Sequence, residues 1–230
     1  MKILIILTSH SLLGETAATS KGKTGFWIEE FAAPYYIFKN AGATITLASP
    51  MGGQPPIDPK SDAPENQRDA TIRYKSDKNL LKLMSQTLKL ENIDTNDFDA
   101  VFFPGGHGPL WDLTSNKDSI RIIQELHNDN KPIAAVCHAT SVLLNVKDKS
   151  GNYLIKNKKV TGFSNTEEVA VKLDKIVPFL LEDELKNKGG IYSKMQDWKS
   201  YVVKDGLLIT GQNPQSSEAV ARELIGILKK

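Results

Sequence analysis

The single cysteine of the chain, Cys137, directly follows the short apolar run Ile133–Val136 and precedes His138. Ala135 and Ala139, two residues before and two residues after it, are small, as the sharp turn of a nucleophile elbow requires. A thiol at the N-terminal end of a helix gains stabilisation of its thiolate from the helix dipole and from backbone N–H groups without a helical partner. The pattern therefore favours a nucleophilic Cys137. The alternative is a small buried side chain that only packs.

A second candidate segment, Phe102–Gly108, ends an apolar run in a loop with three glycines. Loops at the carboxyl ends of parallel strands converge on one crevice, so we expect this loop beside Cys137. There the backbone N–H groups of Gly105 and Gly106 would form an oxyanion hole, and His107 would contact a substrate. One alternative is a phosphate-binding loop, but the dinucleotide fingerprint and the Walker Lys-Ser/Thr pattern are absent. The other is a glycine turn that binds nothing.

Glu30 is a candidate acid or base on the expected helix Gly25–Phe38. It lies three residues after Trp27, on an otherwise apolar helix face. A carboxylate among aromatic rings loses hydration, which raises its pKa toward the range useful for proton transfer or for sharing a proton with a thiol. Pro34 cannot donate to the carbonyl of Glu30, so we expect the helix to bend or end there. The alternative is a partly exposed glutamate at a kink.

The segment Thr161–Glu168 follows another apolar run and offers a carboxylate that would orient His138, completing a Cys–His–acid arrangement. The same segment also fits an ordinary helix start with acidic residues in its first turn. A metal site built from His10, His107, His138 and Glu30 would lack tight ligand spacing, so we expect no metal.

The elements that must position these residues follow from the alternation of short apolar runs with amphipathic segments. This alternation is typical of a mainly parallel sheet with helices on both faces. The expected strands are Ile3–Leu7, Thr44–Ala48, Ala100–Phe103, Ile133–Val136 and Lys159–Thr161. The expected helices are Gly25–Phe38, Lys78–Leu90, Ser119–Asn128, Ala139–Leu144, Val177–Asn187 and Gln215–Leu228. An Asp-Gly pair within Tyr201–Thr210 predicts an antiparallel hairpin near the C-terminus.

Length and composition favour one α/β domain over residues 1–230. The chain is 40% hydrophobic and 24% charged, which is ordinary for a globular protein with a full core. A net charge of +2 gives no strong field toward nucleic acid or an anionic membrane, so we expect neither partner. One cysteine excludes an internal disulfide and fits a reducing compartment. The N-terminal run Ile3–Leu7 is too short to span a membrane and short even for a signal-peptide core, so we expect a cytoplasmic protein.

Five motifs in the same order along the chain resemble those of the ThiJ/PfpI superfamily, the flavodoxin-like relatives of class I glutamine amidotransferases. Within that superfamily they are most similar to the glyoxalase III and heat-shock chaperone branch. The resemblance spans nearly the whole chain. The motifs are Thr24-Gly25-Phe-Trp-Ile-Glu-Glu30 with Pro34, Phe103-Pro-Gly-Gly-His-Gly108, Ala135-Val-Cys-His138, Thr161-Gly-Phe163 with Glu168, and Thr210-Gly-Gln-Asn-Pro214.

The resemblance implies a role for each matched residue. Cys137 would be the nucleophile, and Glu30 the acid that touches its sulfur. His138 would pair with Glu168. The amide of Gly106, with that of His138, would form the oxyanion hole.

The sequence departs from the family pattern in one place and leaves two positions open. Ala139 stands where many relatives have glycine. Glu29 lies beside Glu30 and Glu167 beside Glu168, so the identity of each acid depends on the helix register.

The resemblance also implies an activity: a glutathione-independent glyoxalase, a lyase without a cofactor, that converts methylglyoxal to D-lactate through a hemithioacetal on Cys137. It implies a small reactive carbonyl substrate and a homodimer. Trp27, His107, Trp111 and Trp198 are candidates for substrate selection, and the sequence does not rank them.

Three alternative functions remain open at this point. One is a holding chaperone or stress protein that binds unfolded client proteins. Another is a cysteine-dependent amidase, peptidase or deglycase that uses the same thiol. The third is a redox sensor in which Cys137 stops at the sulfinic acid.

Overall fold

In the computed structural model, which describes all residues 1–230, seven strands form one sheet in the order β3-β2-β1-β4-β5-β9-β8. Every neighbouring pair is parallel except β8 and β9, which form an antiparallel hairpin at one edge. This confirms the expected α/β class and the C-terminal hairpin. The strands are β1 (Lys2–Ile6), β2 (Thr44–Ser49), β3 (Leu88–Lys89), β4 (Ala100–Phe103), β5 (Ile133–Val136), β8 (Val202–Asp205) and β9 (Leu208–Gly211).

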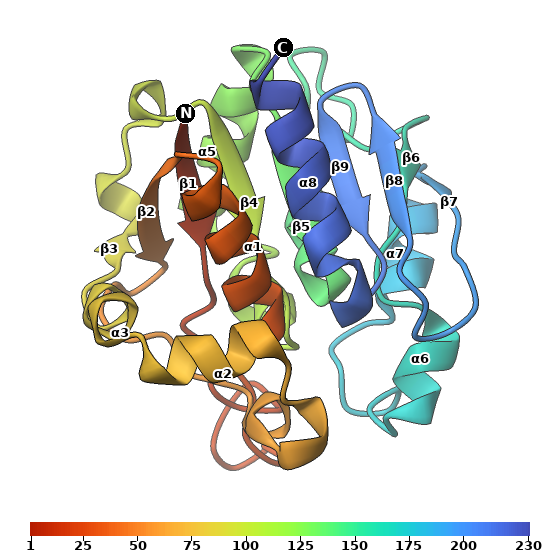
Figure 1. Cartoon of the computed structure of the whole chain (residues 1–230). Helices are drawn as coiled ribbons and strands as arrows, with labels where there is room; N and C mark the ends of the chain where they lie inside the picture. The colour runs from red at the N-terminus through yellow and green to blue at the C-terminus, as the bar shows by residue number, and fades with distance from the viewer.

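Helices cover both faces of this sheet (Figure 1). In that view α1 (Ile28–Asn40) and α8 (Ser217–Leu228) lie side by side in front of the sheet, and α5 (Lys117–Asn128) lies behind it. The shorter helices are α2 (Asp69–Ser76), α3 (Lys78–Met84), α4 (Pro109–Asp112), α6 (Asn165–Ala170) and α7 (Leu181–Asn187). The 3₁₀ helix η5 (Cys137–Leu143) directly follows β5. Other short 3₁₀ helices occupy Pro59–Asp62, Pro64–Asn66, Leu90–Asn92, Thr95–Asp97 and Pro214–Ser216.

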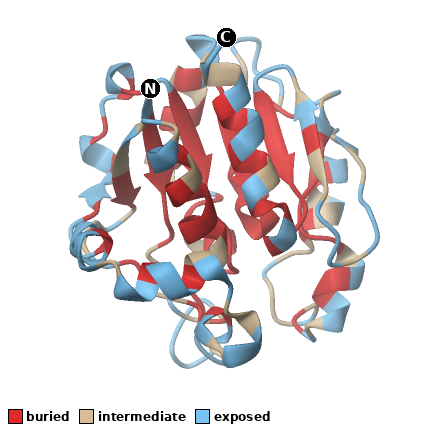
Figure 2. Ribbon diagram, in the orientation of Figure 1, coloured by how far each residue is buried: buried red, intermediate tan, exposed pale blue.

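Burial explains why these segments take these forms. Every residue of β4 and β5 is buried, as expected for central parallel strands covered on both faces. α5 is amphipathic, and the side chain of Asn116 accepts from two backbone N–H groups at the helix start. One cluster of 50 buried apolar residues joins the sheet to its helices, and in Figure 2 the central strands are buried along their length. The core is thus continuous from the sheet to the helices that cover it.

The run Lys159–Thr161 does not join the main sheet, so this expectation is wrong. It forms β6 (Lys159–Val160), which pairs in parallel with β7 (Ile191–Tyr192) in a separate two-stranded sheet. The hairpin explains the difference, because β9 pairs with β5 along its length and leaves no free edge there.

The first long helix begins at Ile28 and continues past Pro34 to Asn40, although we expected it to bend or end near the proline. A proline removes only its own N–H, and most residues of α1 on both sides of Pro34 are buried. Tertiary packing therefore holds the helix together across this position.

The expected helix Lys78–Leu90 ends early, at Met84. Thr87 and Gly53 exchange backbone hydrogen bonds of 2.9 and 3.3 Å, which lead the chain into β3 beside β2. The expected helix Ala139–Leu144 is the 3₁₀ helix η5. None of the helices has the length and apolar character needed to cross a membrane.

Candidate active site

Cys137 lies at the carboxyl end of β5 in a strained backbone conformation. Its φ is +59°, in the left-handed region that non-glycine residues rarely adopt. The neighbouring strand β4 ends at Phe103, so the glycine loop that follows reaches the same edge of the sheet. The strand β5, the strained Cys137 and the 3₁₀ helix η5 that follows have the layout of the expected nucleophile elbow.

Gly105 fills the narrow space between Cys137 and Glu30. Its backbone N–H donates to Oε2 of Glu30 at 2.8 Å. A Cβ atom at this position would lie 2.5 Å from that oxygen and 2.9 Å from Cβ of Cys137. Only glycine fits without a shift of one of these groups.

This hydrogen bond corrects one sequence-based expectation. The N–H of Gly105 serves the buried carboxyl of Glu30, so it does not point into an oxyanion hole. The N–H of Gly106 has no hydrogen-bond partner within the protein, and its φ of +95° suits glycine. Of the two glycine amides, that of Gly106 remains the candidate oxyanion donor.

His138 connects the thiol to an acidic residue. Its Nδ1 lies 3.3 Å from Sγ of Cys137, and its Nε2 lies 2.6 Å from Oε2 of Glu168. Glu168, rather than Glu167, is therefore the acid beside His138. The other oxygen of Glu168 lies 2.9 Å from Nε2 of His107, whose ring packs on the His138 ring with centroids 3.9 Å apart. The pairing of His107 with the same carboxylate was not apparent from the sequence, in which His107 lies 61 residues from Glu168.

The hydrogen bonds assign the protons on these rings. A carboxylate only accepts, so Nε2 of both His107 and His138 must carry the proton that it donates to Glu168. Nδ1 of a neutral His138 then presents a lone pair to the thiol of Cys137. This is the tautomer that a base for the thiol requires.

The shifts in pKa agree with a neutral imidazole and an ionised acid. Burial, together with the nearby His107, lowers the pKa of His138 below its ordinary value. Burial alone would raise the pKa of Glu168, but the positive charge that His138 carries when protonated and the hydrogen bonds from both histidines outweigh it and hold that pKa well below its usual range.

Glu30 also lies near the sulfur and is completely buried. Burial raises its pKa well above the ordinary value, despite the nearby thiol of Cys137 and the hydrogen bond from the N–H of Gly105. Burial also raises the pKa of the Cys137 thiol, and a charge on Glu30 would raise it further. The pair therefore accommodates one negative charge but not two. A protonated Glu30 allows the sulfur to ionise, with the backbone N–H of His138 also donating toward it.

A cavity of ≈ 420 Å³ opens onto these groups. Cys137 is 3% exposed, and it shares the cavity lining with Trp27, Phe163 and Trp198. Cationic Lys60 and Arg68 also line the cavity. Lys60 belongs to the segment Pro50–Pro64, here named the Pro- and Gly-rich excursion, and Arg68 follows that segment closely. The excursion therefore borders the site.

Two sequence candidates lie elsewhere. Trp111 does not line this cavity, and instead stacks on His10 with ring centroids 5.2 Å apart. Nε2 of His10 is hydrogen bonded to the carbonyl oxygens of Leu12 and Gly14. The four residues considered for a metal site, His10, His107, His138 and Glu30, therefore do not lie together. His107, His138 and Glu168 do lie together, within 4.8 Å, and their facing atoms are joined by hydrogen bonds.

Known proteins resemble the chain over its full length. It is 30% identical to glyoxalase 3 of Candida albicans, over 98% of this chain and 97% of that protein. It is 29% identical to the glutathione-independent glyoxalase HSP31 of Saccharomyces cerevisiae, over 99% and 98%. The solved structure of the Rapid Encystment Protein of 24 kDa from Francisella tularensis matches with a TM-score of 0.92 and 38% identity, over 99% of this chain and 98% of that one.

A family model agrees with these matches. The DJ-1/PfpI family model covers residues 23–226, a range that contains every residue of the site described above. The resemblance drawn from five short motifs is thereby confirmed, and the chain belongs to the DJ-1/PfpI family.

Proposed function

We propose that this protein is a glutathione-independent glyoxalase that converts methylglyoxal to D-lactate on the thiol of Cys137. The observation that carries the proposal is the contact of Sγ with Nδ1 of His138 at 3.3 Å, in a cavity that the buried carboxyl of Glu30 also lines. A thiol, a base and an acid in contact suit addition to an aldehyde followed by proton transfer. The names of the two yeast relatives support the same activity.

The first step is addition of the thiol to the aldehyde carbon, C1. Nδ1 of His138 takes the thiol proton, and the sulfur forms a bond to C1. The resulting alkoxide is stabilised by the N–H of Gly106 and takes the proton back from His138. The product is a neutral hemithioacetal on Cys137.

The second step moves a proton between adjacent carbons. His138, again neutral, removes the proton of C1 while Glu30 gives its proton to the oxygen on C2, which yields an enediol. His138 then protonates C2, and Glu30 recovers a proton from the oxygen on C1. The C1 carbon is oxidised and the C2 carbon is reduced by the same pair of electrons, so no external redox partner enters. A thioester of lactate remains on Cys137.

The third step is hydrolysis of this thioester. Water adds to C1 with His138 as its base, the C1–S bond breaks, and the thiolate leaves as the hydroxy acid is released. Glu168 holds the ring of His138 in the required tautomer throughout, because it accepts from Nε2.

The test is to follow methylglyoxal loss and D-lactate formation without glutathione in the native protein and in Cys137→Ala. Turnover in the native protein and its loss in the variant support the proposal. Glu168→Gln is expected to lower kcat by roughly 10²-fold or more, since its amide has no charge and offers one acceptor oxygen to the N–H groups of two histidines. No D-lactate from the native protein would overturn the proposed function.

A further inference from the structure

Glu167 is a buried carboxylate that the chemistry above does not use, although it is the neighbour of Glu168 on α6. Its Oε2 accepts from the backbone N–H of Ser164 at 3.0 Å and from the Ser164 hydroxyl at 2.8 Å. Its Oε1 accepts from the backbone N–H of Trp198 at 2.9 Å and from the side-chain amide of Asn213 at 2.8 Å. Four donors satisfy this carboxylate, so it is a fixed anchor for the groups that it binds.

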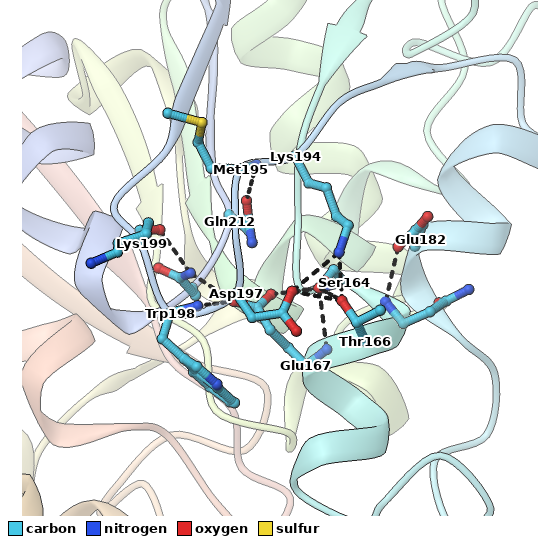
Figure 3. Close-up of polar contacts among 12 residues, drawn as sticks. Ser164, Thr166, Glu167, Glu182, Lys194, Met195, Asp197, Trp198, Lys199 and Gln212 are labelled. Atoms are coloured by element: carbon cyan, nitrogen blue, oxygen red, sulfur yellow. Dashed lines mark hydrogen bonds and ion pairs between the residues drawn. The ribbon is translucent and has the colours of Figure 1, made fainter.

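The anchored groups belong to residues 194–199, here named the Trp198 loop (Figure 3). Near the start of the loop, the N–H of Met195 donates to Gln212 at 2.8 Å. At its end, Asn213 donates to the carbonyl oxygen of Lys199 at 2.9 Å. Glu167 holds the loop at Trp198, between these two contacts, and its bond to Asn213 connects it to the contact at Lys199.

Trp198 turns its indole away from this network (Figure 3) and lines the cavity that contains Cys137. Its φ is +63°, a conformation that strains a bulky side chain, and it is 40% exposed. The indole meets the ring of Phe163 at 5.8 Å, and that ring packs on His138 at 4.2 Å. An aromatic wall therefore runs from the exposed indole to the proposed base.

The volume of the cavity indicates which part of a substrate would lie beside Phe163 and Trp198. At about 30 Å³ for each water-sized group, the five heavy atoms of methylglyoxal fill roughly 150 Å³. The cavity measures ≈ 420 Å³, so a substrate bonded to Cys137 leaves room for a larger substituent beside the aromatic wall. A half-exposed indole is suited to an apolar or aromatic group.

We propose that Trp198 is a specificity-determining residue, whose indole binds the apolar or aromatic substituent of the carbonyl compound held on Cys137, and that Glu167 is the residue that positions it. The inference rests on the proposed function for its substrate class. The placement of the indole relative to the thiol can be tested without turnover.

Alkylation of Cys137 provides that test, because Cys137 is the single cysteine of the chain. The rates of modification by iodoacetamide and by its N-phenyl analogue are measured by intact-protein mass spectrometry, and each is divided by its rate with free N-acetylcysteine. The native protein is expected to favour the N-phenyl reagent. Trp198→Ala is expected to lower this preference about tenfold, through loss of one aromatic contact and the apolar area that it covers. An unchanged preference would overturn the proposal.

Glu167→Gln and Glu168→Gln form a matched pair of neighbouring, isosteric variants. In Glu167→Gln, either orientation of the new amide would turn its N–H₂ group toward other donors, so the Trp198 loop loses its anchor and the preference is expected to fall several-fold. Glu168→Gln changes the base of the thiol, so both alkylation rates change and their ratio stays. Gln196 is an exposed residue of the Trp198 loop, and Gln196→Ala is expected to change neither the alkylation rates nor their ratio. If Glu167→Gln altered both rates equally, its positioning role would be excluded.

Trp198→Gly separates specificity from structure, since it removes the indole and relieves the positive φ at the same time. The proposal expects a Tm equal to or above that of the native protein together with loss of the N-phenyl preference. A lower Tm with the preference intact would show that the indole only packs on Phe163.

As a second readout, kcat/KM for phenylglyoxal is expected to fall about tenfold more than kcat/KM for methylglyoxal in Trp198→Ala. If the native protein turned over neither compound, the alkylation result would still stand, so the two proposals fail separately.

Discussion

At the scale of single residues, the site depends on groups of fixed size and fixed protonation around one sulfur atom. Gly105 fixes the size, since any Cβ there would overlap Glu30 and Cys137. Glu30 and Glu168 fix the protonation, because the pKa of Glu30 is raised and that of Glu168 is lowered. These features lead to two predictions.

Gly105→Ala is expected to cost about 1–3 kcal/mol in the free energy of unfolding, the usual range for overpacking a filled interior. Activity is expected to fall with it, because the shift moves Glu30 away from the thiol. Urea unfolding and methylglyoxal turnover measure the two effects. The control is Gly226→Ala in α8, where a Cβ would meet nothing within 4 Å; it is expected to stabilise by about 0.5–1 kcal/mol. A Gly105→Ala variant as stable as the native protein would contradict the tight contact.

Glu30→Gln and Glu168→Gln are expected to change the pH dependence of stability with opposite signs. The folded pKa of Glu30 is raised, so its contribution is fully present below the unfolded value near 4.5 and is lost as pH rises through the folded pKa. Glu30→Gln should therefore gain Tm relative to the native protein between pH 4.5 and neutrality. The folded pKa of Glu168 is lowered, so its contribution is present above 4.5 and is lost as pH falls. Glu168→Gln should lose Tm near neutral pH and approach the native protein in acid. Parallel Tm curves for the native protein and both variants would argue against both shifts.

At the scale of elements, the apolar runs were sufficient to predict the central strands, and the Asp-Gly pair was sufficient for the hairpin. Helices that bury apolar residues at helical spacing were predicted as well. The start of α6 was given only as one of two interpretations of Thr161–Glu168, because its buried side chains are Glu167 and Glu168, the reverse of an amphipathic pattern. α2 was missed because it buries only Thr71 and Tyr74. The sequence placed Cys137, His138 and Glu30 in one site, but which of two adjacent glutamates faces His138 follows from the capping contacts at the start of α6.

The start of α5 allows a prediction at this scale. The side chain of Asn116 accepts from the backbone N–H groups of Asp118 at 2.9 Å and Ser119 at 3.0 Å, both of which lack a partner inside the helix. Asn116→Ala is expected to cost about 1 kcal/mol in the free energy of unfolding. Asn128→Ala, at the exposed end of the same helix, serves as the control and should stay within about 0.5 kcal/mol of the native protein. Equal midpoints of urea unfolding for the two variants would exclude the cap as a source of stability.

At the scale of the whole molecule, the site is assembled from segments far apart in the chain, and sequence pattern alone does not show which of them meet. The Pro- and Gly-rich excursion returns to the residues before α1, where the N–H of Phe26 donates to Pro56 and the N–H of Asp58 donates to Phe26. Through this return, Lys60 and Arg68 come to line the cavity. The expected homodimer and the chaperone alternative stay predictions.

The buried contact between Thr24 and Asp58 tests this assembly. The Thr24 hydroxyl donates to Oδ2 of Asp58 at 2.9 Å, and the other carboxylate oxygen accepts from the N–H of Lys60. Thr24→Val and Asp58→Asn are each expected to loosen the excursion, raising KM for methylglyoxal more than they lower kcat, because neither residue is hydrogen bonded to Cys137, His138 or Glu30. A hydrogen bond to a charged group contributes about 1.5–3 kcal/mol, and the two changes act on the same bond, since Thr24→Val removes its donor and Asp58→Asn removes the charge of its acceptor. The double variant should therefore lose much less stability in urea than the sum of the single losses. Additive losses would show that the two residues act independently and that other contacts hold the excursion over the site.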